Sequence, residues 1–145
     1  MRVDFHSGVA DKLVAACGFL HKAQAAGASV VVCGDPGTLD RLDSLLWTFD
    51  SLSFLPHLRV RGDAPPPAMS ARTPTWLVDD LAASASREVL LNLGPAMPAG
   101  WETFARVVEI VSANATDATA GRERWRQYKA HADVELLHHQ RIDTP

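Results

Sequence analysis

The chain has 145 residues and a formal net charge of -3, from 14 lysines and arginines against 17 aspartates and glutamates. A chain of this length forms one domain with its own hydrophobic core, and its charge argues against binding nucleic acid over a broad basic surface. No apolar stretch is long enough to span a membrane, and the N-terminus lacks the basic region, apolar run and cleavage site of a signal peptide, so we expect a cytoplasmic protein without membrane contacts.

The N-terminal part of the chain is typical of a strand, a helix and a second strand. Residues 3–6 predict a short strand, and Ser7-Gly8 predicts a turn. From residue 9 to about residue 26 the apolar residues recur at spacings of four, four and three, which indicates an amphipathic helix; they are Val9, Leu13, Cys17 and Leu20. Residues 29–33 form a continuous apolar run that predicts an inner parallel strand, covered on both faces.

A second helix and an irregular apolar segment follow. Asp35 can cap the free amides of a helix, and Pro36 suits its first position, so we expect a helix that ends near Trp47 or Thr48. Residues 49–58 are apolar but match neither a helix nor a strand, and such a segment either folds back into the core or is covered by a partner. Residues 59–73 contain a proline run and predict a stiff, extended connection.

Strands and helices continue to alternate in the second half of the chain. Asp79 and Asp80, at the end of a strand, are expected to cap the next segment. Residues 1–133 then form the domain, and residues 134–145 are expected to form a polar tail that frays. The predicted elements are strands at 74–78, 88–93 and 106–111, a helical turn at 101–105 and a helix at 115–132.

This order of elements predicts a single-domain α/β protein with a Rossmann-like three-layer fold and a largely parallel sheet. The first strand–helix turn holds a single glycine, and the second, at residues 34–37, would direct the carboxylate of Asp35 toward a phosphate, so neither matches a nucleotide-binding motif. Neighbouring residues on a strand point to opposite faces, which argues against a shared acid site at Asp79 and Asp80. We expect no catalytic residues, no metal and no cofactor.

A concentration of positive charge lies on the predicted C-terminal helix. Arg122, Arg126 and Lys129 are three and four residues apart, which places them on one face of a helix, and Trp125 lies beside them. One interpretation is a solvated helix face, with Trp125 and Tyr128 packed into the core. The other is a site for a ligand that is both acidic and apolar.

Three stretches, in order along nearly the whole chain, resemble the chi subunit family of bacterial DNA polymerase III holoenzyme. The first is Arg41-Leu42-Asp43-Ser44-Leu45-Leu46-Trp47 followed by Ser53-Phe54-Leu55-Pro56-His57, which has the family's Leu-Asp-x-x-Leu-Trp and Phe-x-Pro-His pattern. The second is Asn92-Leu93 with Pro95, Phe104 and the strand at 106–111. The third is Gly121-Arg122-Glu123-Arg124-Trp125-Arg126-Gln127-Tyr128-Lys129, which is similar to the family's C-terminal helix.

The resemblance implies a non-catalytic adaptor with a Rossmann-like fold that lacks the nucleotide site. Such an adaptor binds the acidic C-terminal tail of the single-stranded-DNA-binding protein SSB, which ends in an aromatic residue, and it meets single-stranded DNA only through SSB. It also binds the psi subunit, which links it to the clamp loader. The positions implied for the SSB tail are Val111, Arg122, Trp125, Arg126 and Lys129, and those implied for psi are Trp47, Phe54 and Leu55.

Two alternatives remain at this point. The fold class also suits a nucleotide-binding α/β domain, and the basic helix face also suits a direct single-stranded-DNA binder, whose affinity would fall steeply with salt. The turn before Arg122, Asp117-Ala118-Thr119-Ala120, lacks the extra lysine of some family members, which places more weight on Arg122 and Arg126.

Overall fold

The structure is a computed structural model that describes residues 1–49, 54–62 and 73–140. Within these ranges the chain forms a seven-stranded sheet, in the order β3-β4-β2-β5-β6-β1-β7, and all neighbouring strands are parallel. Its elements are β1 (Arg2–Val9), α1 (Lys12–Ala25), β2 (Val30–Cys33), α2 (Pro36–Thr48), β3 (His57–Val60), β4 (Thr75–Val78), β5 (Val89–Asn92), β6 (Arg106–Ser112), α4 (Ala115–Lys129) and β7 (Glu135–Gln140).

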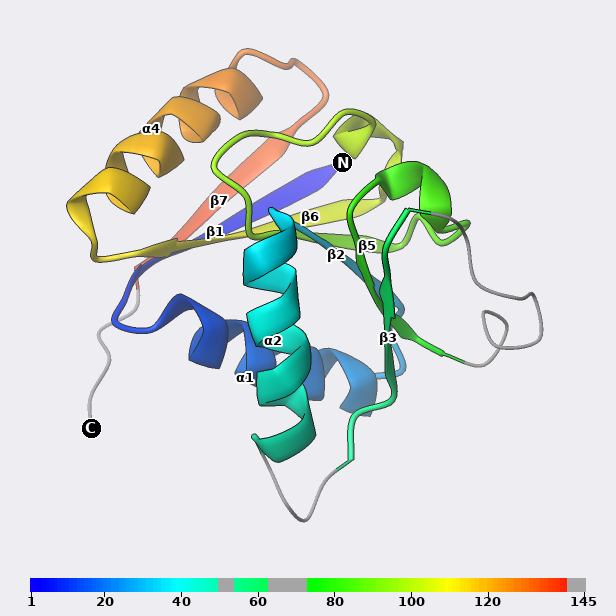
Figure 1. Ribbon diagram of the computed structural model, residues 1–145. Helices are drawn as coiled ribbons and strands as arrows, with labels where there is room; N and C mark the ends of the chain where they lie inside the picture. Colours follow the sequence, from blue (N-terminus) through cyan, green and yellow to red (C-terminus); the bar gives the residue numbers. More distant parts are fainter. Residues whose placement is uncertain (50–53, 63–72, 141–145) are drawn as a thin grey trace.

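Helices cover both faces of the sheet and complete three layers (Figure 1). The helices α1 and α2 pack on one face, where Cys17, Leu20 and Leu42 meet alternate residues of the central strands. On the other face lie α4 and two short 3-10 turns, Leu81–Ala83 and Trp101–Thr103. The predicted α/β fold class is confirmed, and none of the helices in the described ranges has the length and apolar character needed to cross a bilayer.

The inner strands form where the sequence is continuously apolar. All four residues of each of β2, β4 and β5 are buried, as expected for strands with a helical layer on either side. The two cysteines, Cys17 and Cys33, are both unpaired and lie buried in the two apolar cores.

Aspartate side chains hold the N-terminal ends of the first two helices. Asp11 accepts hydrogen bonds from the amides of Leu13 and Val14. Asp35 lies one residue before the helix that begins at Pro36 and accepts a hydrogen bond from the amide of Thr38. In Rossmann-type nucleotide sites a phosphate accepts hydrogen bonds from helix N-terminal amides of this kind. Here the carboxylates occupy them and bring negative charge to the same place.

The expected turn at Ser7-Gly8 was wrong. The strand β1 continues through these residues to Val9, and its pairing with β6 shifts register between His6 and Val9. Gly8 has a positive φ of 74°, a conformation that glycine adopts without steric cost, so the chain keeps its strand pairing across the irregularity. As a result α1 begins at Lys12 rather than near residue 9.

Two edge strands were missed. The strand β3, at His57–Val60, falls where an irregular segment and a stiff connection were expected, and β7, at Glu135–Gln140, falls in the expected frayed tail. Because an edge strand is only partly covered, its sequence need not be apolar; β7 pairs with β1 from Arg2 to Ser7 even though it carries two histidines and a glutamine. The domain therefore extends beyond residue 133, and residues 141–145 lie outside the described ranges.

A buried carboxylate on β1 links the three strands β6, β1 and β7 at this edge of the sheet. The side chain of Asp4 on β1 is fully buried and accepts hydrogen bonds from Arg2 at 2.9 Å and from Arg106 on β6 at 2.8 Å, while His139 on β7 lies 3.0 Å from its other oxygen. Burial opposes ionisation of Asp4, but hydrogen bonds from Arg2, His139 and Arg106 outweigh it and lower the pKa from 3.8 to about 2.

We expect the Asp4→Asn variant to lose the part of its stability that depends on this carboxylate. A carboxyl group whose pKa is lower in the folded protein stabilises it above the unfolded pKa, and this contribution disappears as the pH falls through the folded value. The free energy of unfolding, measured with urea from pH 7 to pH 2, should therefore be lower for the variant at pH 7, and the difference should shrink between pH 4 and pH 2. A difference that stays constant over this range would contradict the assignment.

Candidate functional site

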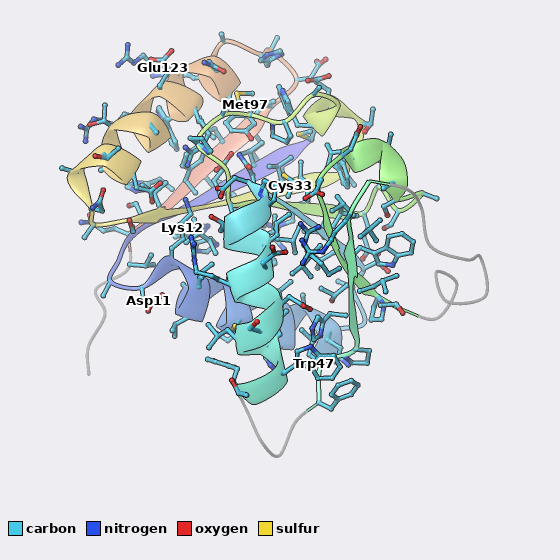
Figure 2. The ribbon with its side chains drawn as sticks, in the orientation of Figure 1. Asp11, Lys12, Cys33, Trp47, Met97 and Glu123 are labelled. Carbon is cyan, nitrogen blue, oxygen red and sulfur yellow. The ribbon has the colours of Figure 1, made fainter. Side chains whose placement is uncertain are left out.

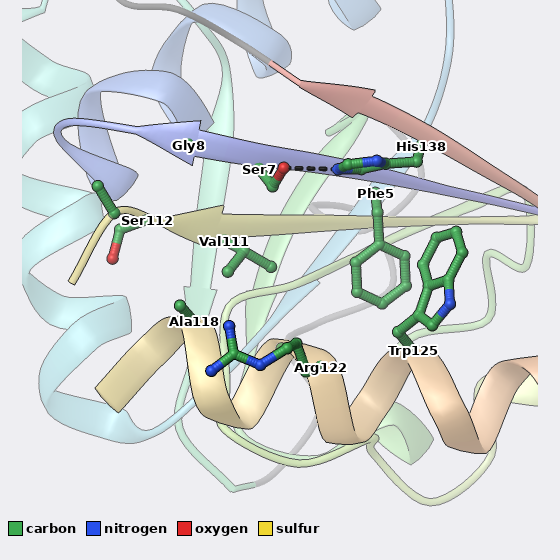
Figure 3. Close-up of a pocket in the computed structure, with 11 residues that line it drawn as sticks. Phe5, Ser7, Gly8, Val111, Ser112, Ala118, Arg122, Trp125 and His138 are labelled. Atoms are coloured by element: carbon green, nitrogen blue, oxygen red, sulfur yellow. Dashed lines mark hydrogen bonds between the residues drawn. The ribbon is translucent and has the colours of Figure 1, made fainter. Parts of the chain in front are cut away.

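A mainly apolar pocket of about 420 Å³ lies between α4 and the C-terminal ends of β1 and β6 (Figure 3). Its apolar lining includes Phe5, Val111 and Trp125, and its polar lining includes Ser7, Arg122 and His138. Three separate parts of the chain meet here, since β1 supplies Phe5 and Ser7, α4 supplies Arg122 and Trp125, and β7 supplies His138.

Aromatic rings form one wall of the pocket. The rings of Phe5 and Trp125 meet edge to face with centroids 5.2 Å apart, and Trp125 meets the ring of His138 at 5.8 Å. Aromatic pairs favour this arrangement, which holds the Trp125 ring in place while leaving it partly exposed to the pocket.

The absence of a side chain at Gly121 lets α4 lie close against β6. A Cβ at this position would fall 2.8 Å and 2.9 Å from the two methyl carbons of Val111, closer than carbon atoms pack. The glycine therefore sets the distance between helix and strand, which positions Arg122 and Trp125 over the end of β6.

A buried polar network next to the pocket fixes α4 against the sheet. Arg124 and Glu109 are both nearly inaccessible to solvent and form an ion pair of 2.9 Å. Asn92 and Tyr128 donate hydrogen bonds of 2.9 Å and 2.8 Å to the second carboxylate oxygen of Glu109, and Arg124 also donates to the carbonyl of Pro95. Arg124 therefore serves as an internal support for the helix and does not belong to the exposed basic face.

Burial in this network also shifts the pKa values of Glu109 and Tyr128. Burial raises the pKa of Glu109, against the charge of Arg124 and the donors Asn92 and Tyr128, which lower it. Burial and the adjacent Glu109 raise the pKa of the Tyr128 hydroxyl, so Tyr128 remains a hydrogen-bond donor.

The structure divides the five residues expected to bind the SSB tail into two groups. Val111, Arg122 and Trp125 line the pocket. Arg126 and Lys129 do not line it and lie on the exposed surface of α4, where Arg126 approaches Glu123 at 3.5 Å.

Sequence reasoning missed other residues of the same pocket, among them Phe5, Ser7 and His138. Phe5 and Ser7 alternate along the first strand and therefore point to one face, a signal that was present in the sequence. His138 could not be placed, because the strand that carries it was expected to be a frayed tail.

A second group of aromatic residues lies at the C-terminal end of α2. The side chains of Trp47 and Phe54 are 58% and 64% exposed, and their ring centroids are 5.4 Å apart; Figure 2 shows Trp47 at this end of the molecule. Leu55, by contrast, is fully buried in the core that α1 and α2 form with the sheet. Of the expected psi-binding positions, Trp47 and Phe54 are therefore available at the surface, and Leu55 is not.

The ring of His57 packs against the ring of Trp47. The two ring centroids are 4.8 Å apart, and the His57 ring contacts the carbonyl oxygen of Leu55 at 2.8 Å and the carboxylate of Asp43 at 3.0 Å. The contact with Asp43 lacks the alignment of a hydrogen bond, so it is a charge contact only when His57 is protonated. The chi-like pattern residues Asp43, Trp47, Phe54 and His57 thus form one contiguous cluster.

Comparison with known proteins gives a consistent result. The family model described as DNA polymerase III chi subunit, HolC, matches residues 1–135. The DNA polymerase III subunit chi of Pseudomonas aeruginosa is 30% identical over 134 residues, which cover 88% of this chain and 89% of that protein.

We expect the Arg124→Met variant to lower the free energy of unfolding by about 3–5 kcal/mol, because it leaves the carboxylate of Glu109 buried without its counter-ion. Arg126→Met, on the same helix, is the matched control. Its ion pair with Glu123 is exposed on both sides, so the loss should stay below about 1 kcal/mol. Urea unfolding of the two variants would measure both values, and equal losses would contradict the role given to Arg124.

Proposed function

Since the chain belongs to the family of DNA polymerase III chi subunits, we propose that it acts as a non-catalytic adaptor in DNA replication and binds the C-terminal tail of SSB in the pocket between α4 and β6. The observation that carries the proposal is the pairing of a mainly apolar pocket with the guanidinium of Arg122 in its lining.

The chemistry of the tail agrees with this pocket. An acidic peptide that ends in an aromatic residue needs an apolar cavity for the ring and a cation for the terminal carboxylate. Phe5, Val111 and Trp125 supply the apolar surface, and Arg122 supplies the cation. The terminal ring then packs against Trp125 and Val111, and its carboxylate pairs with Arg122.

Arg126 and Lys129 extend the positive charge along α4, outside the pocket. Both are exposed, so they suit the acidic residues that precede the aromatic tip of the tail. Contacts of this kind steer association and contribute little affinity each, because solvent and salt screen them.

The exposed pair Trp47 and Phe54 is the proposed contact for psi or another clamp-loader component. Large aromatic side chains that remain exposed on a folded domain are typical centres of protein interfaces. Leu55 then contributes from the core, by anchoring the chain next to Phe54. Single-stranded DNA is reached indirectly, through SSB.

The two alternatives have less support. The capping carboxylates of Asp11 and Asp35 occupy the helix N-terminal amides that a nucleotide phosphate would need. A direct DNA binder requires a broad basic surface, whereas the net charge here is -3. A thermal-shift screen with ATP and NAD, and a titration with bare single-stranded DNA, would each reveal the corresponding activity.

We expect the Arg122→Ala variant to bind a labelled SSB-tail peptide about 10- to 100-fold more weakly, the effect of losing one charged hydrogen-bond partner. Fluorescence anisotropy measures this change. Arg41→Ala is the matched control, because Arg41 on α2 is also exposed and makes the same 3.3 Å hydrogen bond to a threonine three residues earlier. An amidated peptide should bind wild-type protein as weakly as the free-acid peptide binds the variant, and unchanged affinity in Arg122→Ala would exclude the proposed site.

We expect the Phe54→Ala variant to bind psi at least about 30-fold more weakly, because removing an aromatic interface anchor costs about 2 kcal/mol or more. Its affinity for the SSB-tail peptide should not change, since Phe54 does not line the pocket. Calorimetry with purified psi measures the loss, and Val14→Ala, at an exposed apolar position on α1, is the control. Equal psi affinity for wild type and Phe54→Ala would place the interface elsewhere.

A further inference from the structure

Ser7 and His138 face the pocket from the sheet, across from Arg122 on α4 (Figure 3). We propose that they form a second anion-recognition element, in which protonated His138 frees the Ser7 hydroxyl to donate a hydrogen bond to the bound carboxylate. The proposal rests on the tail-binding function proposed above and assigns residues of that site on β1 and β7.

The geometry of the pair limits what Ser7 can do. Ser7 Oγ and His138 Nε2 are 2.6 Å apart, and both side chains line the pocket. A serine hydroxyl has one proton to donate and two lone pairs that accept. With the ring proton of a neutral His138 on Nδ1, Nε2 accepts that hydroxyl proton, so the hydroxyl offers only lone pairs to the pocket, and lone pairs repel a carboxylate.

Protonation of His138 reverses the direction of this hydrogen bond. Both ring nitrogens of the charged form carry a proton, so Nε2 donates to Ser7 Oγ, and the hydroxyl proton becomes free to point into the pocket. The imidazolium also brings a positive charge to the sheet side of the pocket. A carboxylate is then held between the guanidinium of Arg122 and the hydroxyl of Ser7. Histidine is the side chain whose ordinary charge change falls between pH 5 and pH 8, so binding should strengthen as the pH falls through that range.

The other charged groups around His138 should not mask this pH dependence of binding. Among the lining residues, Arg122 on α4 is the other titratable side chain, and it stays charged throughout. Asp117, at the start of α4, is already held by Lys12 and by the amide of Ser112. On β1 and β7, Asp4 and His139 contact each other on the opposite side of the sheet. The carboxylates of the peptide ionise below pH 5, so its charge stays constant from pH 6 to pH 8.

The test is a titration of the full chain with the SSB-tail peptide at pH 6, 7 and 8 and constant salt. We expect wild-type protein to bind about three- to tenfold more tightly at pH 6 than at pH 8, the range that one additional net hydrogen bond provides. His138→Phe, which keeps a ring against Trp125, should show no such gain, and Ser7→Ala should show a smaller one, because only the charge of the imidazolium then contributes. Calorimetry in buffers of different ionisation enthalpy should show proton uptake on binding to wild type at pH 7, and none with His138→Phe.

The matched control is His131→Phe. His131 packs its ring against Trp101 beyond the end of α4 and does not line the pocket, so this variant should keep the wild-type pH dependence. Equal wild-type affinity at pH 6 and pH 8, or a full gain retained in Ser7→Ala, would overturn the role of the pair while leaving the tail site intact. A wild-type protein that binds no tail peptide at any pH would overturn both proposals.

Discussion

The pocket depends on an ion pair that it does not contain. Glu109 on β6 and Arg124 on α4 are withdrawn from water together, and the desolvation of two charges costs several kcal/mol for each. The cost is tolerated because Asn92 and Tyr128 complete the shell of the carboxylate. This pairing allows little freedom of rotation to α4, so the helix presents Arg122 and Trp125 to the pocket. Such constraints specify one arrangement more than they add net stability.

Two candidate binding surfaces lie at different ends of this small domain. The pocket lies on the α4 side of the sheet, whereas Trp47 and Phe54 lie at the C-terminal end of α2, on the side of the other apolar core (Figures 1 and 2). Because the rigid sheet separates them, occupation of one leaves the other accessible. This separation agrees with the proposed link between SSB and the clamp loader, in which both partners are held at the same time.

The inner strands and the start of α2 could be predicted from the sequence, because their signals are local: a strand buried on both faces is apolar throughout, and a helix start has its own capping residues. The strand β2 is apolar throughout since both its faces are buried, and Asp35-Pro36 marks the start of a helix through local chemistry alone. The edge strands β3 and β7 could not, because they are less completely buried than the inner strands and carry polar residues, and β7 pairs with β1 from the opposite end of the chain. For the same reason the helical spacing pointed to Arg122 and Trp125, while His138 was missed. Arg124 is charged in the sequence like its neighbours, and only its nonlocal partner Glu109 explains why it is buried.

The most direct test of the proposed tail site is an NMR titration of ¹⁵N-labelled protein with the unlabelled SSB-tail peptide. The chain has four tryptophans, whose indole N–H signals can be assigned by substitution. We predict large shifts for the indole of Trp125 and for the amides of Gly8, Ala113 and Gly121, which line the pocket, while the indole of Trp47 stays unchanged. Shifts centred on Trp47, with Trp125 and Gly121 unaffected, would contradict the site.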